Sequence, residues 1–425
     1  MSEAALYIHI PFCEKRCLYC DFYTVAGVET RIPDYISALQ KEIVLRAAEE
    51  FWQRQRFATI FFGGGTPSLL SPVQLAEILE ACFARFSFSA ELEITLETNP
   101  GTITNEQLAQ YRAIGINRLS FGVQSFHPEE LQLLDRIHSP EQAQAALLGA
   151  RYAGFENLSL DLIFALPKQT QKIWRENLKH AVELEPNHIS AYNLTIEAGT
   201  PLDRAITQGK IQPLTEEEER EMYEFTIAFL AQNGYQQYEI SNFAQPGFVA
   251  RHNIKYWDGS AYLGLGASAH SYDGKRRFWN VANLRKYLEC LSRHALAEEG
   301  VEHLTAQQAQ FEFAFLGLRQ TRGVDLQGFQ RKFRKPFEKV FNGAAQEMER
   351  EGLLVRENGF LRLSPEGIFL CDEICARLEN SLKFFYPAIN CHTTIPKHKI
   401  VNPIAASASA CTRKFSRPCS AKPTK

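Results

Sequence analysis

The chain has 425 residues, enough for two or three domains, with 45% hydrophobic and 22% charged residues. This composition is that of an ordinary globular protein and argues against a disordered or fibrous chain. The formal net charge of −3 argues against a surface that is basic throughout, so we do not expect nucleic-acid binding. No apolar run approaches the roughly 20 residues that cross a bilayer, and the N-terminus lacks an export signal, so we expect a cytoplasmic location.

Three cysteines lie close together directly after the apolar, strand-like run Tyr7–Ile10. Cys13, Cys17 and Cys20 have the spacing C-x3-C-x2-C. Thiolates favour iron–sulfur clusters, zinc or copper(I), and a cubane cluster normally takes one cysteine for each iron. Zinc would need a fourth ligand at short spacing, and the usual pair of C-x2-C knuckles is absent. The pattern predicts an iron–sulfur cluster with one open iron, the alternative being three buried or disulfide-bonded cysteines.

Strands and helices alternate through the first part of the chain. A helix is expected from Pro33 to Trp52, and helices are expected to begin at the caps Ser71, Thr104 and Ser139. Strands are expected at 58–62, 92–97, 118–125, 158–164, 188–195 and 235–240. Because strand followed by helix repeats, we predict a parallel sheet that binds its ligand at the carboxyl ends of the strands.

Glycines and polar residues gather at these expected strand ends. The run Gly63-Gly64-Gly65-Thr66 directly follows one strand, which suggests close approach of the backbone to a ligand. Glu97, Gln124 and Asp161 lie at the ends of three others. Each has an ordinary alternative, since Glu97 could cap a loop and Asp161 could be a helix N-cap. Their recurrence on the rim that carries the cysteine loop favours a shared binding site.

The motif C-x3-C-x2-C after Y-x-H-I-P-F resembles the signature of radical S-adenosylmethionine (SAM) proteins. In that superfamily Cys13, Cys17 and Cys20 would ligate a [4Fe–4S] cluster whose open iron chelates the amino and carboxylate groups of SAM. The resemblance implies an α/β fold, a partial (β/α)6 radical SAM barrel. It also implies that SAM is surrounded by Tyr7, Tyr19, Gly64, Gly65, Thr66, Glu97, Gln124, Arg136 and Asp161, with Tyr19 stacked near the adenine.

More narrowly, the chain resembles the oxygen-independent coproporphyrinogen III oxidase family, which has an oxidase branch and a heme chaperone branch. The oxidases carry a further cysteine two residues after the third, where this chain has Phe22. The chaperone branch typically reads C-D-F there, as this chain does. The resemblance implies a protein that binds heme, the cluster and SAM and delivers heme to apoproteins such as membrane respiratory proteins, with peripheral membrane contact. The alternative is the oxidative decarboxylation of coproporphyrinogen III to protoporphyrinogen IX, although no catalytic base is evident.

One histidine lies in an aromatic segment after the last expected barrel strand. His252, Asn253, Tyr256 and Trp257 match the H-N-x-x-Y-W motif of the heme chaperone branch. A neutral imidazole is a common axial ligand of heme iron, and aromatic rings suit a porphyrin face. We therefore expect His252 to bind heme, the alternative being a buried structural histidine among aromatic rings.

The chain is expected to divide into four parts. These are a barrel at 1–240, a linker and heme-binding segment at 241–304, a winged-helix-like C-terminal domain at 305–381 and a disordered tail at 382–425. The C-terminal assignment rests on helices followed by Asn358-Gly359, which is a strong two-residue hairpin signal between alternating strands.

Overall fold

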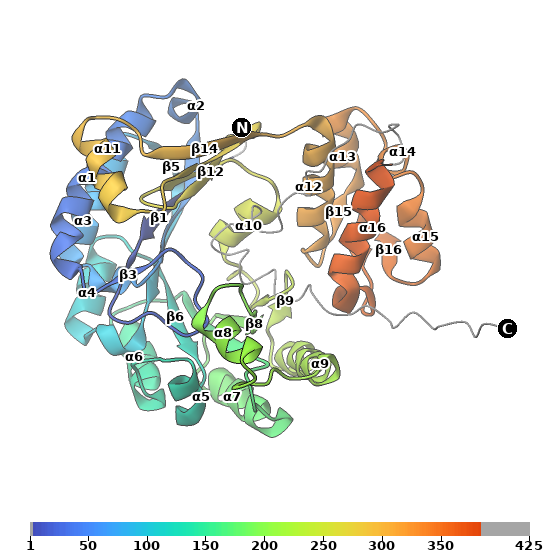
Figure 1. The fold of residues 1–425 in the computed structure, drawn as a ribbon, viewed down its shortest axis with the longest axis horizontal. Helices are drawn as coiled ribbons and strands as arrows, with labels where there is room; N and C mark the ends of the chain where they lie inside the picture. Colours follow the sequence, from blue (N-terminus) through green and yellow to red (C-terminus); the bar gives the residue numbers. More distant parts are fainter. Residues whose placement is uncertain (1–2, 384–425) are drawn as a thin grey trace.

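A curved sheet and a smaller helical domain make up the computed structural model, which describes residues 3–383 (Figure 1). The predicted tail lies almost wholly outside the described residues. The sheet has 12 strands, in the order β14 (Glu298–His303), β13 (Arg276–Asn280), β12 (His270–Tyr272), β11 (Tyr262–Leu265), β1 (Ala4–Ile10), β4 (Arg56–Gly64), β5 (Ser87–Thr98), β6 (Arg118–Gln124), β7 (Leu158–Phe164), β8 (His188–Asn193), β10 (Asn242–Ala244) and β9 (Gln236–Gln237). All neighbours from β11 to β8 pair in parallel.

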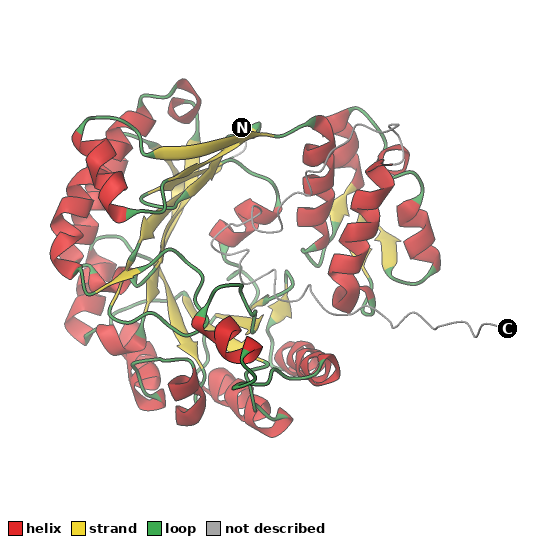
Figure 2. Cartoon of the chain, viewed as in Figure 1, coloured by secondary structure: helices red, strands yellow, loops and turns green. Residues whose placement is uncertain are grey.

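Helices cover the convex side of this sheet, as Figure 2 shows. The helices of the first 300 residues are α1 (Ile32–Ala47), α2 (Glu50–Gln53), α3 (Pro72–Phe83), α4 (Asn105–Ala113), α5 (Pro128–Leu133), α6 (Pro140–Tyr152), α7 (Gln171–Glu183), α8 (Pro201–Thr207), α9 (Glu216–Gln232), α10 (Arg251–Trp257) and α11 (Leu284–Ser292). Ser71, Thr104 and Ser139 each cap a helix reciprocally with a glutamine three residues later. These three predicted helix starts are therefore confirmed.

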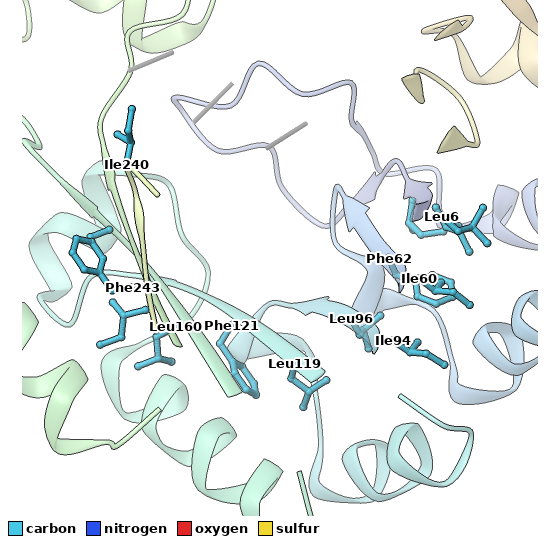
Figure 3. Close-up of a cluster of buried hydrophobic side chains, with 14 of the residues drawn as sticks. Leu6, Ile60, Phe62, Ile94, Leu96, Leu119, Phe121, Leu160, Ile240 and Phe243 are labelled. Carbon is cyan, nitrogen blue, oxygen red and sulfur yellow. The ribbon is translucent and has the colours of Figure 1, made fainter. Parts of the chain in front are cut away.

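The two faces of the parallel strands differ because successive side chains point in opposite directions. One set is apolar and packs with residues of the helices in a single large core. Figure 3 labels members of this set from successive strands, among them Leu6, Ile60, Leu96, Phe121 and Leu160. The alternate set faces the inside of the curve and carries the polar groups. The barrel thus has an apolar layer between the sheet and the helices and a polar interior.

The prediction that residues 235–240 form a strand of the parallel sheet is wrong. The structure has instead the short strands β9 and β10, and β10 pairs antiparallel with both β8 and β9. Between them, Glu239 forms an isolated antiparallel bridge with Gln320, and the Ile240 N–H donates to the Arg319 carbonyl at 3.1 Å. The backbone of residues 239–240 therefore pairs with the C-terminal domain. The parallel part of the sheet is completed instead by β1 at the start of the chain and by β11, which pairs with β1.

Residues 241–304, expected to be a linker, contribute α10, α11 and five strands. Glu42 of α1 fixes part of this segment. Its buried carboxylate accepts hydrogen bonds from the Gly266 N–H at 2.8 Å, Asn280 Nδ2 at 2.6 Å and the Tyr287 hydroxyl at 2.7 Å. Burial raises the pKa of Glu42, while Arg46 one turn later opposes the rise. One carboxylate therefore joins the strands after β11 to the barrel, and the proposed domain boundaries stay a prediction.

The C-terminal domain combines five helices with a three-stranded sheet. Its helices are α12 (Ala306–Leu318), α13 (Leu326–Phe333), α14 (Phe337–Val340), α15 (Ala344–Arg350) and α16 (Cys371–Lys383). The strands β15 (Val324–Asp325), β17 (Phe360–Leu363) and β16 (Leu354–Glu357) lie in that order. Asn358 and Gly359 join β16 to β17 with φ of 51° and 83°. The predicted hairpin is confirmed.

Within residues 3–383 we find no helix that is both long and apolar enough to span a bilayer.

We expect Glu42→Ala to lower the free energy of unfolding by about 3–5 kcal/mol, because it leaves three buried donors without their acceptor and the buried Arg46 guanidinium without a nearby carboxylate charge. Glu80→Ala is a matched control, since Glu80 is exposed on α3, and it should change stability by no more than about 0.5 kcal/mol. Urea denaturation followed by circular dichroism measures both. Equal midpoints for the two variants would contradict the role given to Glu42.

Candidate functional site

A cavity of about 240 Å³ lies at the carboxyl ends of the parallel strands. It brings together most of the predicted site, namely Cys13, Cys17, Tyr19, Cys20, Gly64, Gly65, Thr66, Glu97, Gln124, Arg136 and Asp161. Phe22 also lines it. Of the predicted site residues, Tyr7 and His252 do not line this cavity. The rule that parallel strands bind ligands at their carboxyl ends therefore led to residues that line one cavity.

The three cysteines lie on a loop that starts at β2 (Phe12–Cys13). Cys13 is buried, and Cys17 and Cys20 are partly exposed. The Thr66 hydroxyl donates to Cys13 Sγ and Arg136 Nη1 donates to Cys17 Sγ, each over 3.6 Å. Burial raises the pKa of Cys20 to about 12. In the described part of the chain, no group of three or more His, Cys, Asp or Glu side chains is arranged to hold a metal ion.

The glycine loop is held against the strand that leads to the cysteines. The Gly65 N–H donates to the Ile10 carbonyl at 2.8 Å, and the Thr66 N–H donates to the Phe12 carbonyl at 2.7 Å. Gly64 has a φ of 113°, and a Cβ there would lie 2.4 Å from the His9 ring. The glycines were predicted to let the backbone approach a ligand closely. In the structure they let it approach another segment of the same chain.

Two carboxylates face the cavity, Glu97 from β5 and Asp161 from β7, and β6 lies between these two strands. Glu97 accepts a hydrogen bond from the Gly64 N–H at 3.1 Å, and burial, together with the nearby Asp161, raises the pKa of Glu97 to about 8. Asp161 accepts from the Ser190 hydroxyl at 2.7 Å and from the Ser120 hydroxyl at 3.0 Å, and burial raises its pKa too. Glu97 is thus mostly protonated at neutral pH, until a cation near it favours the ionised form.

Two further features mark this rim as built for a ligand. Gln124 has a φ of 69°, an unusual backbone conformation for a residue with a side chain. Arg136 Nη2 donates to the Gly122 carbonyl at 2.6 Å, while its buried Nε has no partner in the protein. Such unpaired buried donors are rare in proteins and indicate a missing partner.

The sequence analysis overlooked the end of β8 and the loop that follows it. Asn193 and Thr195 line the cavity, and the Asn193 Oδ1 and Thr195 Oγ1 atoms are buried without a protein partner. Asn193 is the last residue of β8. Applying the strand-end rule to this strand would have found it. With Arg136 Nε, these atoms give a polar ligand both donors and acceptors, which fits SAM.

Tyr7 lies below the cavity rather than on its wall. Its side chain is 1% exposed, and its hydroxyl hydrogen-bonds with His9 Nδ1 at 3.0 Å. The other ring nitrogen of His9 lies 3.0 Å from the Tyr23 carbonyl. Tyr7 therefore supports the β1 end of the site from beneath.

His252 lies in a setting that differs from the predicted one. It is fully buried, with its ring stacked on Phe61 at 4.9 Å between centroids. Its Nδ1 is 2.7 Å from the Thr59 hydroxyl, and its Nε2 is 3.0 Å from the Tyr256 hydroxyl. Burial lowers the pKa of His252 to about 3. The imidazole is neutral and both nitrogens are in use, so in this conformation it is a structural residue and not a free iron ligand.

Comparisons with known proteins agree with this geometry. The radical SAM superfamily matches residues 7–181, and the HemN C-terminal domain matches residues 304–370. Heme chaperone HemW of Bacillus subtilis is 34% identical, over 87% of this chain and 97% of that protein. The chain belongs to the HemW family of radical SAM proteins. HemW of Mycobacterium tuberculosis strain H37Rv is 36% identical, over 88% of this chain and 94% of its own.

A solved structure shares the whole architecture. Coproporphyrinogen III oxidase HemN from Escherichia coli, a radical SAM enzyme, is 28% identical with a TM-score of 0.77, covering 89% of this chain and 90% of its own. The predicted α/β radical SAM fold with a C-terminal domain is confirmed. Membership of the superfamily also means that a [4Fe–4S] cluster and SAM are the cofactors of this HemW-family chain.

Cys17→Ala should remove most of the iron and the broad visible absorption from the anaerobically reconstituted protein, because one of three cluster ligands is lost. Cys290→Ala is the matched control, since Cys290 lies on α11 away from the cavity. Iron analysis and absorption spectra measure both. A folded Cys17→Ala variant with the iron content of the parent would contradict the assignment.

Proposed function

We propose that this protein is a heme chaperone, which binds heme, a [4Fe–4S] cluster and SAM and delivers heme to apoproteins, including membrane respiratory proteins. The observation that carries the proposal is the similarity to proteins named heme chaperone HemW, at 34% and 36% identity over nearly their full lengths. Phe22 supports it, because it lines the cavity where the oxidases have a further cysteine. We place the protein in the cytoplasm, with peripheral contact at the membrane during delivery.

The cluster and SAM belong in the cavity at the strand ends. Cys13, Cys17 and Cys20 would each ligate one iron, which leaves the fourth iron open. The bound cluster and SAM supply one-electron chemistry to this site. Arg136 is placed to bind a carboxylate through its free Nε. Asp161, held by two serine hydroxyls, is placed to accept from a ligand's hydroxyl or amino group.

The second candidate is coproporphyrinogen III oxidase activity. It is favoured by the likeness to HemN over 89% of this chain. Shared fold does not establish shared chemistry, which depends on residues at the site. The residue after Cys20 and Asp21 is where the two branches differ, and Phe22 supplies a phenyl ring with no ligand or proton-transfer group. We therefore rank this activity second.

SAM binding should release a proton in the range below pH 8. Glu97 is protonated below its pKa of about 8 in the protein itself, and the positive charges of SAM favour its ionised form. Affinity should rise as pH increases towards 8 and then level off. Calorimetry in two buffers with different heats of ionisation counts the protons. Glu97→Gln should abolish the release, and an equal release from the variant and the parent would contradict this role.

One anaerobic experiment on the reconstituted protein distinguishes the two candidate functions. Heme should bind with a defined stoichiometry and a Soret band distinct from that of free heme. Coproporphyrinogen III, SAM and a reductant should give no protoporphyrinogen, since the oxidases' further cysteine is absent. The product is measured by fluorescence after oxidation to the porphyrin, with HemN as the positive control. Multiple turnovers would instead establish the oxidase.

A further inference from the structure

A buried cation without a partner lies in the interior of the barrel. Arg118 is the first residue of β6 and is 2% exposed, and it is the only lysine or arginine in the four strands β5, β6, β7 and β8. Its Nε has no hydrogen-bond partner, and within residues 3–383 its guanidinium makes no ion pair. Burying an unpaired charge costs folding free energy, and residues that break this rule are expected at functional sites.

The pairing of the strands places Arg118 beneath the cavity at the strand ends. Successive side chains alternate along β6, so Arg118 and Ser120 share the inward side. Leu119 and Phe121, labelled in Figure 3, pack in the core on the other side. Ser120 lines the cavity and is the partner of Glu97 in the ladder between β5 and β6, whereas Arg118 does not line the cavity. The guanidinium thus belongs to the inward-facing position directly below the cavity lining.

The charge of Arg118 acts on the two carboxylates that face the cavity. Burial and the neighbouring Asp161 raise the pKa of Glu97, and Arg118 is among the groups that oppose the rise. Burial also raises the pKa of Asp161, and Arg118 is again among the groups that oppose the rise. A guanidinium keeps its charge in proteins, and no ion pair neutralises this one. Its field therefore reaches both carboxylates through the low dielectric of the interior.

The other titratable groups near Arg118 are neutral or already hydrogen-bonded. Burial, and then Arg118, lowers the pKa of His188 well below its ordinary value and that of His252 to about 3. Burial raises the pKa of Tyr238 well above its ordinary value, although Arg118 opposes the rise. Glu93, on the inward side of β5, accepts hydrogen bonds from the first two N–H groups of α10 at 3.2 and 3.0 Å. Arg118 therefore supplies the positive charge below the cavity.

We propose that Arg118 is a positioning residue of the SAM site, whose unpaired charge beneath the cavity favours the ionised carboxylates of Glu97 and Asp161. SAM carries an ammonium and a sulfonium group, and ionised carboxylates bind such cations. An arginine already paired with a carboxylate would have little charge left to act on the cavity. The inference rests on the proposed place of SAM in this cavity, and it does not depend on heme delivery.

Arg118→Met tests the inference with two measurements on the anaerobically reconstituted protein. Urea denaturation at pH 7 should give a midpoint equal to or above that of the parent, because the variant loses a buried charge that has no partner. Calorimetry of SAM binding at pH 8, in two buffers with different heats of ionisation, counts the protons released. The parent should release about half a proton per SAM, because the pKa of Glu97 is about 8. The variant should release nearly one, since more Glu97 is protonated before SAM binds.

Two further variants complete the comparison. Arg112→Met is the matched control, since Arg112 is exposed on α4, and it should match the parent in both measurements. Arg118→Gln keeps a hydrogen-bonding side chain without the charge, and it should show the same extra proton release as Arg118→Met.

Three results would contradict the inference. If the parent and both Arg118 variants release equal numbers of protons, Arg118 does not act on Glu97; abolition of the release by Glu97→Gln would still leave the proposed place of SAM intact. If both Arg118 variants fail to fold, the guanidinium is a structural residue. If Glu97→Gln binds SAM with the affinity and proton release of the parent, the placement of SAM against Glu97 is wrong, and the inference fails with it.

Discussion

The site depends on the pairing between the ends of two neighbouring strands, β1 and β4. Beyond their parallel ladder, the N–H groups of Gly65 and Thr66 bond to the carbonyls of Ile10 and Phe12. This fixes the glycine loop directly beside the start of the cysteine loop. A side chain at Gly64 would meet the His9 ring at 2.4 Å, and the φ of 113° there disfavours any residue with a Cβ. The protein's own backbone therefore holds the glycine loop beside the start of the cysteine loop.

Local chemistry in the sequence predicted much of the architecture. The caps at Ser71, Thr104 and Ser139 and the turn at Asn358-Gly359 formed as expected, because each depends on a few residues in a row. The cavity at the strand ends also followed from the sequence, since the alternation of strand and helix fixes where the polar ends converge.

What the sequence could not show depends on contacts between distant residues. The segment at Glu239 has the pattern of a strand, but its backbone pairs with residues 319–320, which no local pattern reveals. His252 has the motif of a heme ligand, but Thr59 from β4 and Tyr256 occupy its two nitrogens. A second cavity, lined by the end of α10 and by α12 and α13, likewise exists only because distant segments of the chain meet.

The two cavities divide the chemistry of the molecule. The cavity at the strand ends has thiols, strained backbone and buried polar atoms without partners, which suit a cluster and SAM. The second cavity, between α10 and the C-terminal domain, is lined by aromatic rings and by charged side chains of both signs. Tyr256 lines this second cavity and also hydrogen-bonds with His252 inside the barrel.

The central claim is that this chain carries heme for other proteins. The most direct measurement mixes the anaerobically prepared, heme-loaded protein with the purified apo form of a heme-dependent respiratory protein and follows the absorption spectrum. The account predicts that the acceptor's heme spectrum appears, and that the heme-loaded protein transfers faster than the same amount of heme bound to albumin. Retention of heme by this protein, with no signal from the acceptor, would contradict the account.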